Sequence, residues 1–118
     1  MRPKIVAGNW KMNGNQAFVH DYMSSFKECW NEKRLDQFTD LSVIIVPPAI
    51  LISSVQESAN RVGVNGRFEL ASQNVAEYSS GAYTGEISAS MLKDIGCNWS
   101  LVGHSERRAL FGDQAIVI

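Results

Sequence analysis

The chain has 118 residues, 45% of them hydrophobic, and its 11 basic and 12 acidic side chains give a formal net charge of −1. Its length suits a single domain, and the mixing of charges along it excludes a basic nucleic-acid-binding stripe and an acidic disordered tail. No apolar run approaches the roughly 18 residues of a membrane span, and the run at residues 5–7 is too short for a signal peptide. We therefore expect a cytoplasmic protein that binds a small molecule and neither nucleic acid nor membrane.

Short runs rich in β-branched residues alternate with longer amphipathic segments, which is typical of βα units in a parallel sheet. The first strand is predicted at residues 4–9 and the first helix at residues 15–35. Aromatic side chains at every fourth position of this helix predict its buried face: Phe18, Tyr22, Phe26 and Trp30. We expect the helix to pack on the sheet.

A second strand is predicted at residues 41–46. Pro47 and Pro48 end it and preset the backbone for the first turn of a helix. The inward-facing residues of that helix are predicted to be Ile50, Leu51 and Val55. Gly63 then marks the return to the sheet.

A third strand is predicted at residues 68–74, and a loop follows at residues 75–85. Ser88 is a suitable N-terminal cap for the next helix, which Gly96 ends. The buried face of this helix is predicted to comprise Met91, Leu92 and Ile95.

A fourth strand, predicted at residues 99–103, leads into a polar cluster at residues 103–108, as the first strand leads into another at residues 9–11. Right-handed crossovers put the carboxyl ends of parallel strands on the same side of a sheet, so both clusters share one face. No repeat, low-complexity segment or Pro/Gly-rich linker divides the chain. We expect an α/β fold in one domain or part of one.

The two cysteines, Cys29 and Cys97, lie far apart and belong to no Cys-x-x-Cys or Cys/His pattern. The sequence therefore predicts neither a metal site nor a disulfide. We expect two reduced, semi-buried thiols.

Two side chains of the first cluster suit an anionic substrate. Lys11 lies just beyond the strand, where its ammonium can supply positive charge, and Asn9 offers both a donor and an acceptor to a substrate oxygen. Each has a structural alternative, because solvated lysines are common in loops and Asn9 also suits a turn before Gly14.

In the second cluster, His104 precedes a helix start at Ser105, so its ring lies near unpaired amides and the positive end of a helix dipole, which disfavour an imidazolium. A neutral imidazole can donate to a substrate carbonyl and pass protons between adjacent oxygens; the alternative is a structural histidine that caps the loop. Glu106, in the first helical turn, should be ionised and poorly basic. It therefore suits a partner for Lys11 better than a base acting on carbon.

Three segments carry a resemblance to a known family: Asn-Trp-Lys-Met-Asn at residues 9–13, Tyr-Thr-Gly-Glu-Ile-Ser at residues 83–88, and Gly-His-Ser-Glu-Arg-Arg at residues 103–108. Together and in this order they resemble the N-terminal half of triosephosphate isomerase. The resemblance implies about the first four βα units of a TIM (β/α)8 barrel, a fold of roughly 250 residues. Residues 1–118 would then be the N-terminal half of one barrel domain, with no second domain.

The resemblance further implies the interconversion of dihydroxyacetone phosphate and glyceraldehyde 3-phosphate through an enediolate, in glycolysis and gluconeogenesis, with no metal or organic cofactor. By this resemblance Lys11 and His104 are catalytic, as electrostatic stabiliser and electrophile, and Asn9 and Lys11 bind substrate. The family is itself the known example of such a neutral histidine.

Residues behind and beside the site also take roles by resemblance. Glu106 would hold Lys11 in place, and Ser105 would support the site from the same turn. In the family, the loop matching residues 75–86 inserts into the partner of a homodimer, with Thr84 approaching the partner's site. A homodimer with Thr84 at its interface is therefore implied.

The family's catalytic glutamate, lid and main phosphate-binding loops come from its second half, so we expect this truncated chain to be inactive alone. The alternative function is a non-catalytic half-barrel that associates with itself or with a separate C-terminal half, because four parallel strands leave two open edges and an apolar inner face. A Schiff-base aldolase or an epimerase barrel also places a lysine at a strand end, but Lys11 follows Asn-Trp at the rim and not in a deep apolar pocket. The tail at residues 115–118 is more apolar than the family pattern predicts.

Overall fold

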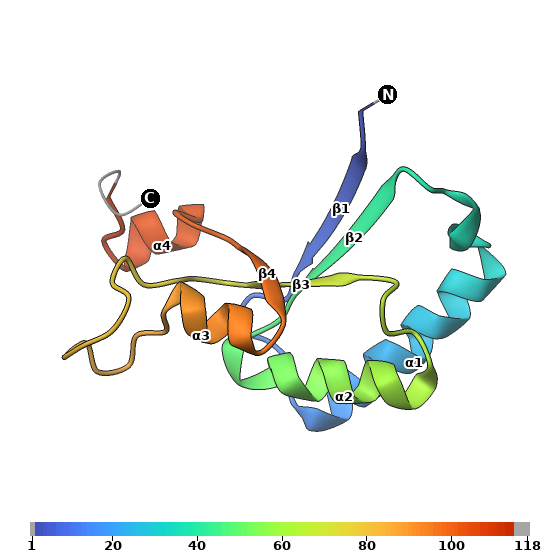
Figure 1. Cartoon of the computed structure of the whole chain (residues 1–118), viewed down its shortest axis with the longest axis horizontal. Coiled ribbons are helices and arrows are strands. Elements are labelled where there is room, and N and C mark those ends of the chain that lie inside the picture. The colour runs from blue at the N-terminus through green and yellow to red at the C-terminus, as the bar shows by residue number, and fades with distance from the viewer. Residues whose placement is uncertain (1, 115–118) are drawn as a thin grey trace.

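A computed structural model describes residues 2–114, so the apolar tail at residues 115–118 lies outside the described residues. A parallel sheet forms the centre, with its strands in the sequential order β1-β2-β3-β4 (Figure 1). The strand bounds are β1 (Lys4–Asn9), β2 (Leu41–Val46), β3 (Glu69–Ser72) and β4 (Cys97–Ser100). Each strand is followed by a helix, which confirms the expected α/β fold built from the first βα units of a (β/α)8 barrel.

The helix bounds are α1 (Gln16–Glu32), α2 (Ile52–Val62), α3 (Ala89–Asp94) and α4 (Ser105–Leu110), with short 3₁₀ turns η1 (Leu35–Gln37) and η2 (Ala49–Leu51). The Asn15 side chain caps α1 by accepting a hydrogen bond from the Phe18 N–H at 2.8 Å. Ser88 caps α3 as predicted, because its hydroxyl accepts from the Met91 N–H at 3.2 Å. Local capping chemistry therefore sets where these helices begin. None of the helices between residues 2 and 114 has the length and hydrophobicity to cross a membrane.

The first two strands match the sequence prediction, whereas the third is shorter and the fourth is displaced. β4 begins at Cys97, two residues before the predicted start, and ends at Ser100. Gly96 has a φ of +94°, a left-handed conformation that suits glycine and lets the chain leave α3 and enter β4 at once. Beyond β4, the Leu101 N–H still donates to the Ser72 carbonyl at 2.9 Å, so the chain continues alongside β3 toward His104.

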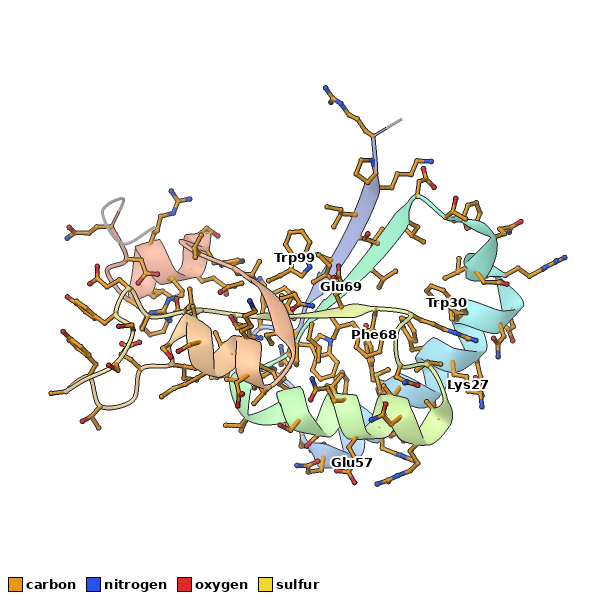
Figure 2. The ribbon with its side chains drawn as sticks, viewed as in Figure 1. Lys27, Trp30, Glu57, Phe68, Glu69 and Trp99 are labelled. Atoms are coloured by element: carbon orange, nitrogen blue, oxygen red, sulfur yellow. The ribbon has the colours of Figure 1, made fainter. Side chains whose placement is uncertain are left out.

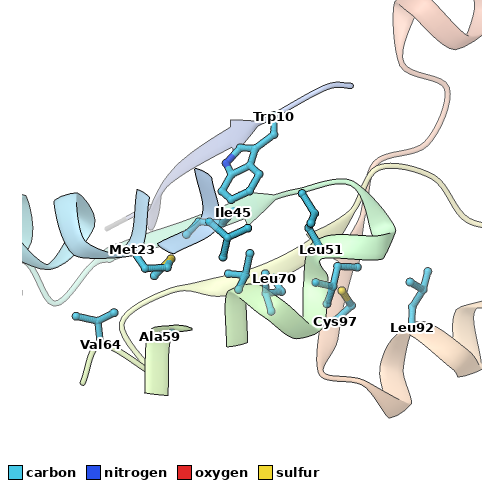
Figure 3. Close-up of a cluster of buried hydrophobic side chains, with 12 residues drawn as sticks. Trp10, Met23, Ile45, Leu51, Ala59, Val64, Leu70, Leu92 and Cys97 are labelled. Carbon is cyan, nitrogen blue, oxygen red and sulfur yellow. The ribbon is translucent and has the colours of Figure 1, made fainter. Parts of the chain in front are cut away.

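The main core lies between one face of the sheet and helices α1, α2 and α3 (Figure 3). One residue from each of three strands faces these helices: Ile45, Leu70 and Cys97. The helices and their flanking turns contribute Val19, Met23, Leu51, Ile52, Val55, Ala59, Val64 and Leu92. Trp10, just beyond β1, closes the core at the carboxyl end of the sheet.

The predicted aromatic face of α1 is only partly correct. Val19, Met23 and Trp30 are buried, whereas Phe18 is exposed and Tyr22 and Phe26 are half-buried. A four-residue step overshoots a helical turn by about 40°, so an i, i+4 stripe winds around the helix instead of following the core. The stripe packs along the edge of the core instead, where Tyr22 meets Trp10 with ring centroids 4.8 Å apart.

The predictions for the shorter helices also need correction. Ile50 is 88% exposed, because it lies in the tight turn η2, which directs Leu51 and not Ile50 inward. In α3 only Leu92 is buried, and Met91 and Ile95 are exposed, because this helix has only six residues and presents one position to the core. Both cysteines are free, as expected, but Cys29 is exposed; Cys97 is buried, and burial raises the pKa of its thiol.

The opposite face of the sheet carries a smaller apolar cluster of Ile44, Val46 and Ala71. The β3–β4 register shifts between Leu70, which pairs with Cys97, and Ala71, which pairs with Trp99. This bulge leaves Asn98 as the extra residue and turns Trp99 to the face opposite Cys97. There the Trp99 indole N–H donates to the Glu69 carboxylate at 3.0 Å (Figure 2).

Candidate active site

The carboxyl ends of the strands bring the two predicted polar clusters together. An open cavity of about 290 Å³ lies at this end of the sheet, a size at the lower limit for small-molecule sites. Its lining includes Asn9, Lys11, Gln73, Glu86, His104 and Glu106. Residues from the first and fourth βα units thus share one cavity.

The segment after β1 is held rigidly. Asn9, the last residue of β1, is in register with Val46, and the Trp10 N–H donates to the Val46 carbonyl at 3.0 Å. The Asn13 side chain donates to the Trp10 carbonyl at 2.9 Å. Trp10 is buried in the core, so its role is packing, and it fixes the backbone immediately before Lys11.

Lys11 has an unusual backbone conformation, with a φ of +56° in the left-handed region. This region costs a non-glycine residue about 1–2 kcal/mol. The Asn9 side-chain oxygen accepts from the Lys11 N–H at 2.9 Å, the short-range contact of an Asx turn. In this structure Asn9 therefore acts as a turn-former, and its side-chain NH₂ group remains the group able to donate to a ligand.

The Lys11 ammonium forms an ion pair with Glu106, with Nζ and Oε1 2.7 Å apart. The hydrogen bond from Lys11 lowers the pKa of the Glu106 carboxyl; partial desolvation opposes this shift, and the charge of Lys11 adds to it. Both side chains are about half exposed, so water and salt screen the pair. Glu106 is thus an ionised partner that fixes Lys11 at the cavity and has little basicity.

His104 is the N-cap residue of α4, and its Nδ1 accepts from the Glu106 backbone N–H at 3.1 Å. Because an accepting Nδ1 carries no proton, this hydrogen bond selects the tautomer with hydrogen on Nε2. Glu106 Oε2 lies 3.7 Å from Nδ1, beyond hydrogen-bond distance, so it does not compete for that position. With Nδ1 engaged by this backbone N–H, Nε2 is the ring nitrogen left to present a donor proton.

The two remaining predicted site residues lie outside this constellation. Ser105 is exposed at the first position of α4. Thr84 is exposed in the long loop before α3 and lines a neighbouring cavity of about 360 Å³ instead of the one at Lys11. In the same loop, Tyr78 and Tyr83 stack with ring centroids 3.9 Å apart.

Two further charged residues, Arg107 and Glu86, line the cavity. The Arg107 guanidinium pairs with Asp113, with Nε donating to Oδ2 at 2.9 Å, so Arg107 braces the end of α4. Glu86 is exposed and lines both cavities. Within residues 2–114, no three His, Cys, Asp or Glu side chains gather in a way that would hold a metal ion.

Gln73 is the site residue that the sequence analysis missed. Its side-chain amide donates to the Lys11 carbonyl at 2.7 Å and to the Val46 carbonyl at 3.2 Å. The available signal was its position at the end of the predicted third strand, where a polar residue meets the same edge as Asn9 and Lys11. A single glutamine carries no motif, so its partners emerge only from the fold.

Chemically, the cavity combines a fixed ammonium, an imidazole whose Nε2 can donate, and a side-chain amide. This set can stabilise negative charge that develops on adjacent oxygens of a small anionic ligand. Glu106 is already committed to Lys11, so it is poorly suited to remove a proton from carbon.

Comparison with known proteins gives a consistent result. Residues 4–118 match the family model described as Triosephosphate isomerase. The triosephosphate isomerase of Marinobacter nauticus is 47% identical over 113 residues, a match that covers 96% of this chain and 41% of the relative. Those of Shewanella frigidimarina and Shewanella amazonensis are 39% and 40% identical over 121 residues, covering 100% of this chain and 44% of each relative. The chain thus spans less than half the length of these curated relatives.

Proposed function

Since the chain belongs to the triosephosphate isomerase family, we propose that its site serves the interconversion of dihydroxyacetone phosphate and glyceraldehyde 3-phosphate in glycolysis. The observation that carries the proposal is the meeting of Lys11, held by Glu106, with His104 at one cavity. A cation and a hydrogen-bond donor at the same place match the charge that develops on an enediolate. We infer a cytoplasmic location from the same metabolic role.

We assign to each group the role that its chemistry and position support. When a proton leaves the carbon next to the carbonyl, negative charge develops on the oxygens, where the Lys11 ammonium stabilises it. The His104 Nε2–H donates to one oxygen and, by giving up and regaining this proton, passes hydrogen between the two. The Asn9 side-chain NH₂ donates to the bound ligand. By family resemblance, Ser105 supports the site from the first position of α4, outside the cavity lining.

The reaction also needs a base that removes the carbon-bound proton. By family resemblance this base is a glutamate of the second half of the barrel, and we infer that residues 1–118 form the N-terminal half of one such domain. The chain then supplies the electrophilic part of the site. We further propose that the family homodimer places Thr84 at the subunit interface.

The second candidate function is a non-catalytic half-barrel, which the exposed apolar side chains of β1 favour: Ile5 is 54% and Val6 58% exposed. Such a molecule would bind anions at the Lys11 site without turnover and would associate through its open sheet.

The test uses two preparations: the 118-residue chain alone, and the chain coexpressed with the part of the Marinobacter nauticus relative that lies outside its match. Isomerase activity is followed by a coupled nicotinamide reaction, and binding of 2-phosphoglycolate, a charged mimic of the enediolate, is followed by calorimetry. We expect binding by the chain alone and turnover only after coexpression. His104→Gln should then lower kcat about 100-fold or more.

His20→Gln is the matched control, because His20 is exposed on α1 and does not line the cavity. Its kcat should equal that of the parent chain. Binding without turnover in both preparations would favour the half-barrel, and equal losses in the two histidine variants would refute the role of His104. If the chain turns over by itself, Glu86→Gln will show whether Glu86 replaces the missing base.

A further inference from the structure

We propose that Gln73 is a positioning residue, whose side-chain amide holds the backbone of Lys11 in its left-handed conformation and thereby keeps the Lys11 ammonium on Glu106. The inference rests on the proposed function, because its value to the protein is the placement of Lys11 at the cavity. Neither the motifs of the sequence nor the family match assigns this role to Gln73.

Gln73 connects three neighbouring strands at their carboxyl ends. It follows β3 by one residue and donates to the Val46 carbonyl, at the end of β2, and to the Lys11 carbonyl, just beyond β1. The contact with Lys11 is the shorter, at 2.7 Å against 3.2 Å. Because the Val46 carbonyl also accepts from the Trp10 N–H, the same point is anchored to the residue preceding Lys11.

The left-handed conformation of Lys11 explains why side chains are needed here. Both polar groups of its backbone are bound by side-chain amides, the N–H by Asn9 and the carbonyl by Gln73. Asn9 comes from the same turn, only two residues away, whereas Gln73 is 62 residues away in sequence. Gln73 is therefore the contact that fixes this turn relative to the rest of the sheet.

Glutamine is chemically suited to this position. Two carbonyl oxygens must be approached by one side chain, and a neutral carboxamide brings two N–H donors and no charge. A glutamate here would place carboxylate oxygens against the two carbonyl oxygens and repel them. An asparagine side chain is one methylene shorter and would reach less far toward them. Gln73 is half-buried, so water replaces these hydrogen bonds incompletely when they are removed.

The experiment detects the position of the Lys11 ammonium through the titration of its ion-pair partner, Glu106. The side-chain carboxyl carbon of Glu106 is followed by NMR as the pH is lowered, in the 118-residue chain and in Gln73→Met, which retains length but has no donor. Release of Lys11 should raise the pKa of Glu106 toward its ordinary value of 4.5. The matched control is Gln56→Met, because Gln56 also donates its side-chain amide to a distant carbonyl, that of Ile95, outside this cavity.

A double-mutant cycle separates positioning from general destabilisation. If Gln73 acts through Lys11, then Gln73→Met should leave the Glu106 titration unchanged in a Lys11→Met background, where the cation is already absent. A shift of the same size in both backgrounds would overturn the proposal. So would an unchanged titration in Gln73→Met alone. The cycle compares variants of equal packing at position 73, so loss of stability alone does not reproduce the expected pattern.

The test also separates this inference from the proposed function. In an active coexpressed preparation, Gln73→Met should lower kcat by up to about 100-fold, the cost of a small displacement of a catalytic group, and Gln56→Met should not. Absence of isomerase activity with the expected titration would refute the function and leave the Gln73–Lys11 coupling established. Full activity in Gln73→Met with an unchanged titration would refute the role of Gln73 alone.

Discussion

At the scale of single residues, Lys11 combines an unfavourable backbone with a favourable side-chain contact. Its φ of +56° is retained because Asn9 and Gln73 bind its backbone and Glu106 binds its ammonium. Strained residues of this kind persist where the surrounding structure over-determines them. The backbone contacts and the ion pair together hold the half-exposed Lys11 side chain at the cavity.

The ion pair makes a pH-dependent contribution to stability. Because Lys11 lowers the pKa of folded Glu106, the contribution is complete above the ordinary carboxyl pKa of 4.5 and is lost as the pH falls through the lowered value. We expect the difference in unfolding free energy between the parent chain and Glu106→Gln to be constant from pH 7 to about 5 and to shrink below 4.5. Urea unfolding at a series of pH values measures it.

Glu57→Gln is the control for that series, because Glu57 forms an exposed i, i+4 ion pair with Arg61 on α2, and such pairs contribute little. Its effect should be small throughout. A difference for Glu106→Gln that grows as the pH falls would contradict the assigned direction of the pKa shift. Added salt should reduce the Glu106 effect at neutral pH, because both partners are half exposed.

The sequence predicted some of the residues that line the cavity and not others, for a physical reason. Lys11 and His104 follow predicted strands and bear chemistry that few other residues supply, so position and residue type together single them out. Gln73 acts through an amide contact with a residue 62 positions away, and no local pattern encodes such a partner. The placement of the His104 ring beside a free backbone N–H was predictable because that N–H belongs to the first turn of the helix that His104 precedes.

At the scale of elements, strand and helix positions were more predictable than the faces they bury. β1, β2 and the predicted cap at Ser88 depend on local propensity and hydrogen bonding, which the sequence carries directly. The burial of a side chain depends on which neighbouring element packs against it. The aromatic stripe of α1 and the residue Ile50 were misplaced because the neighbouring elements, not the periodicity, decide which side is covered.

Ile50 and Ile52 allow a direct test of this correction. Ile52 is fully buried at the start of α2, whereas Ile50, two residues earlier, is 88% exposed. We expect Ile52→Ala to lower the free energy of unfolding by about 2–5 kcal/mol, through lost burial and the cavity it leaves. Ile50→Ala should change it by less than about 0.5 kcal/mol. Urea unfolding of the two variants measures both changes. Equal effects would contradict the exposed position of Ile50 in η2.

At the scale of the whole molecule, the sheet is covered unequally. Helices α1, α2 and α3 pack against one face, while β1 has only β2 as a neighbour among residues 2–114 (Figure 1). Ile5 and Val6 are more than half exposed on that strand. Parallel sheets are normally covered on both faces, and open strand edges recruit further strands.

We therefore expect the 118-residue polypeptide to associate with increasing concentration when prepared alone. Val6→Lys should reduce this association, because a charged edge residue opposes strand addition. Ile50→Lys, which adds the same charge at another exposed apolar position outside the sheet, should have little effect. Sedimentation velocity over a concentration series provides the measurement, and a monomer at every concentration would contradict the expectation.

The bulge in β4 has a consequence for how sequences of different length can be aligned. Asn98 is the residue without a partner, and its removal would leave Cys97 and Trp99 adjacent, still on opposite faces and still opposite Leu70 and Ala71. Deletion of one residue at this point would therefore leave the facing of the neighbouring side chains unchanged, and the chain would still reach the α4 cap in the same orientation. The same deletion inside β2, whose register with β1 is unbroken over six pairs, would turn Ile45 out of the core. A change of length at Asn98 would therefore leave the cavity at the carboxyl ends of the strands in place, whereas one inside β2 would not.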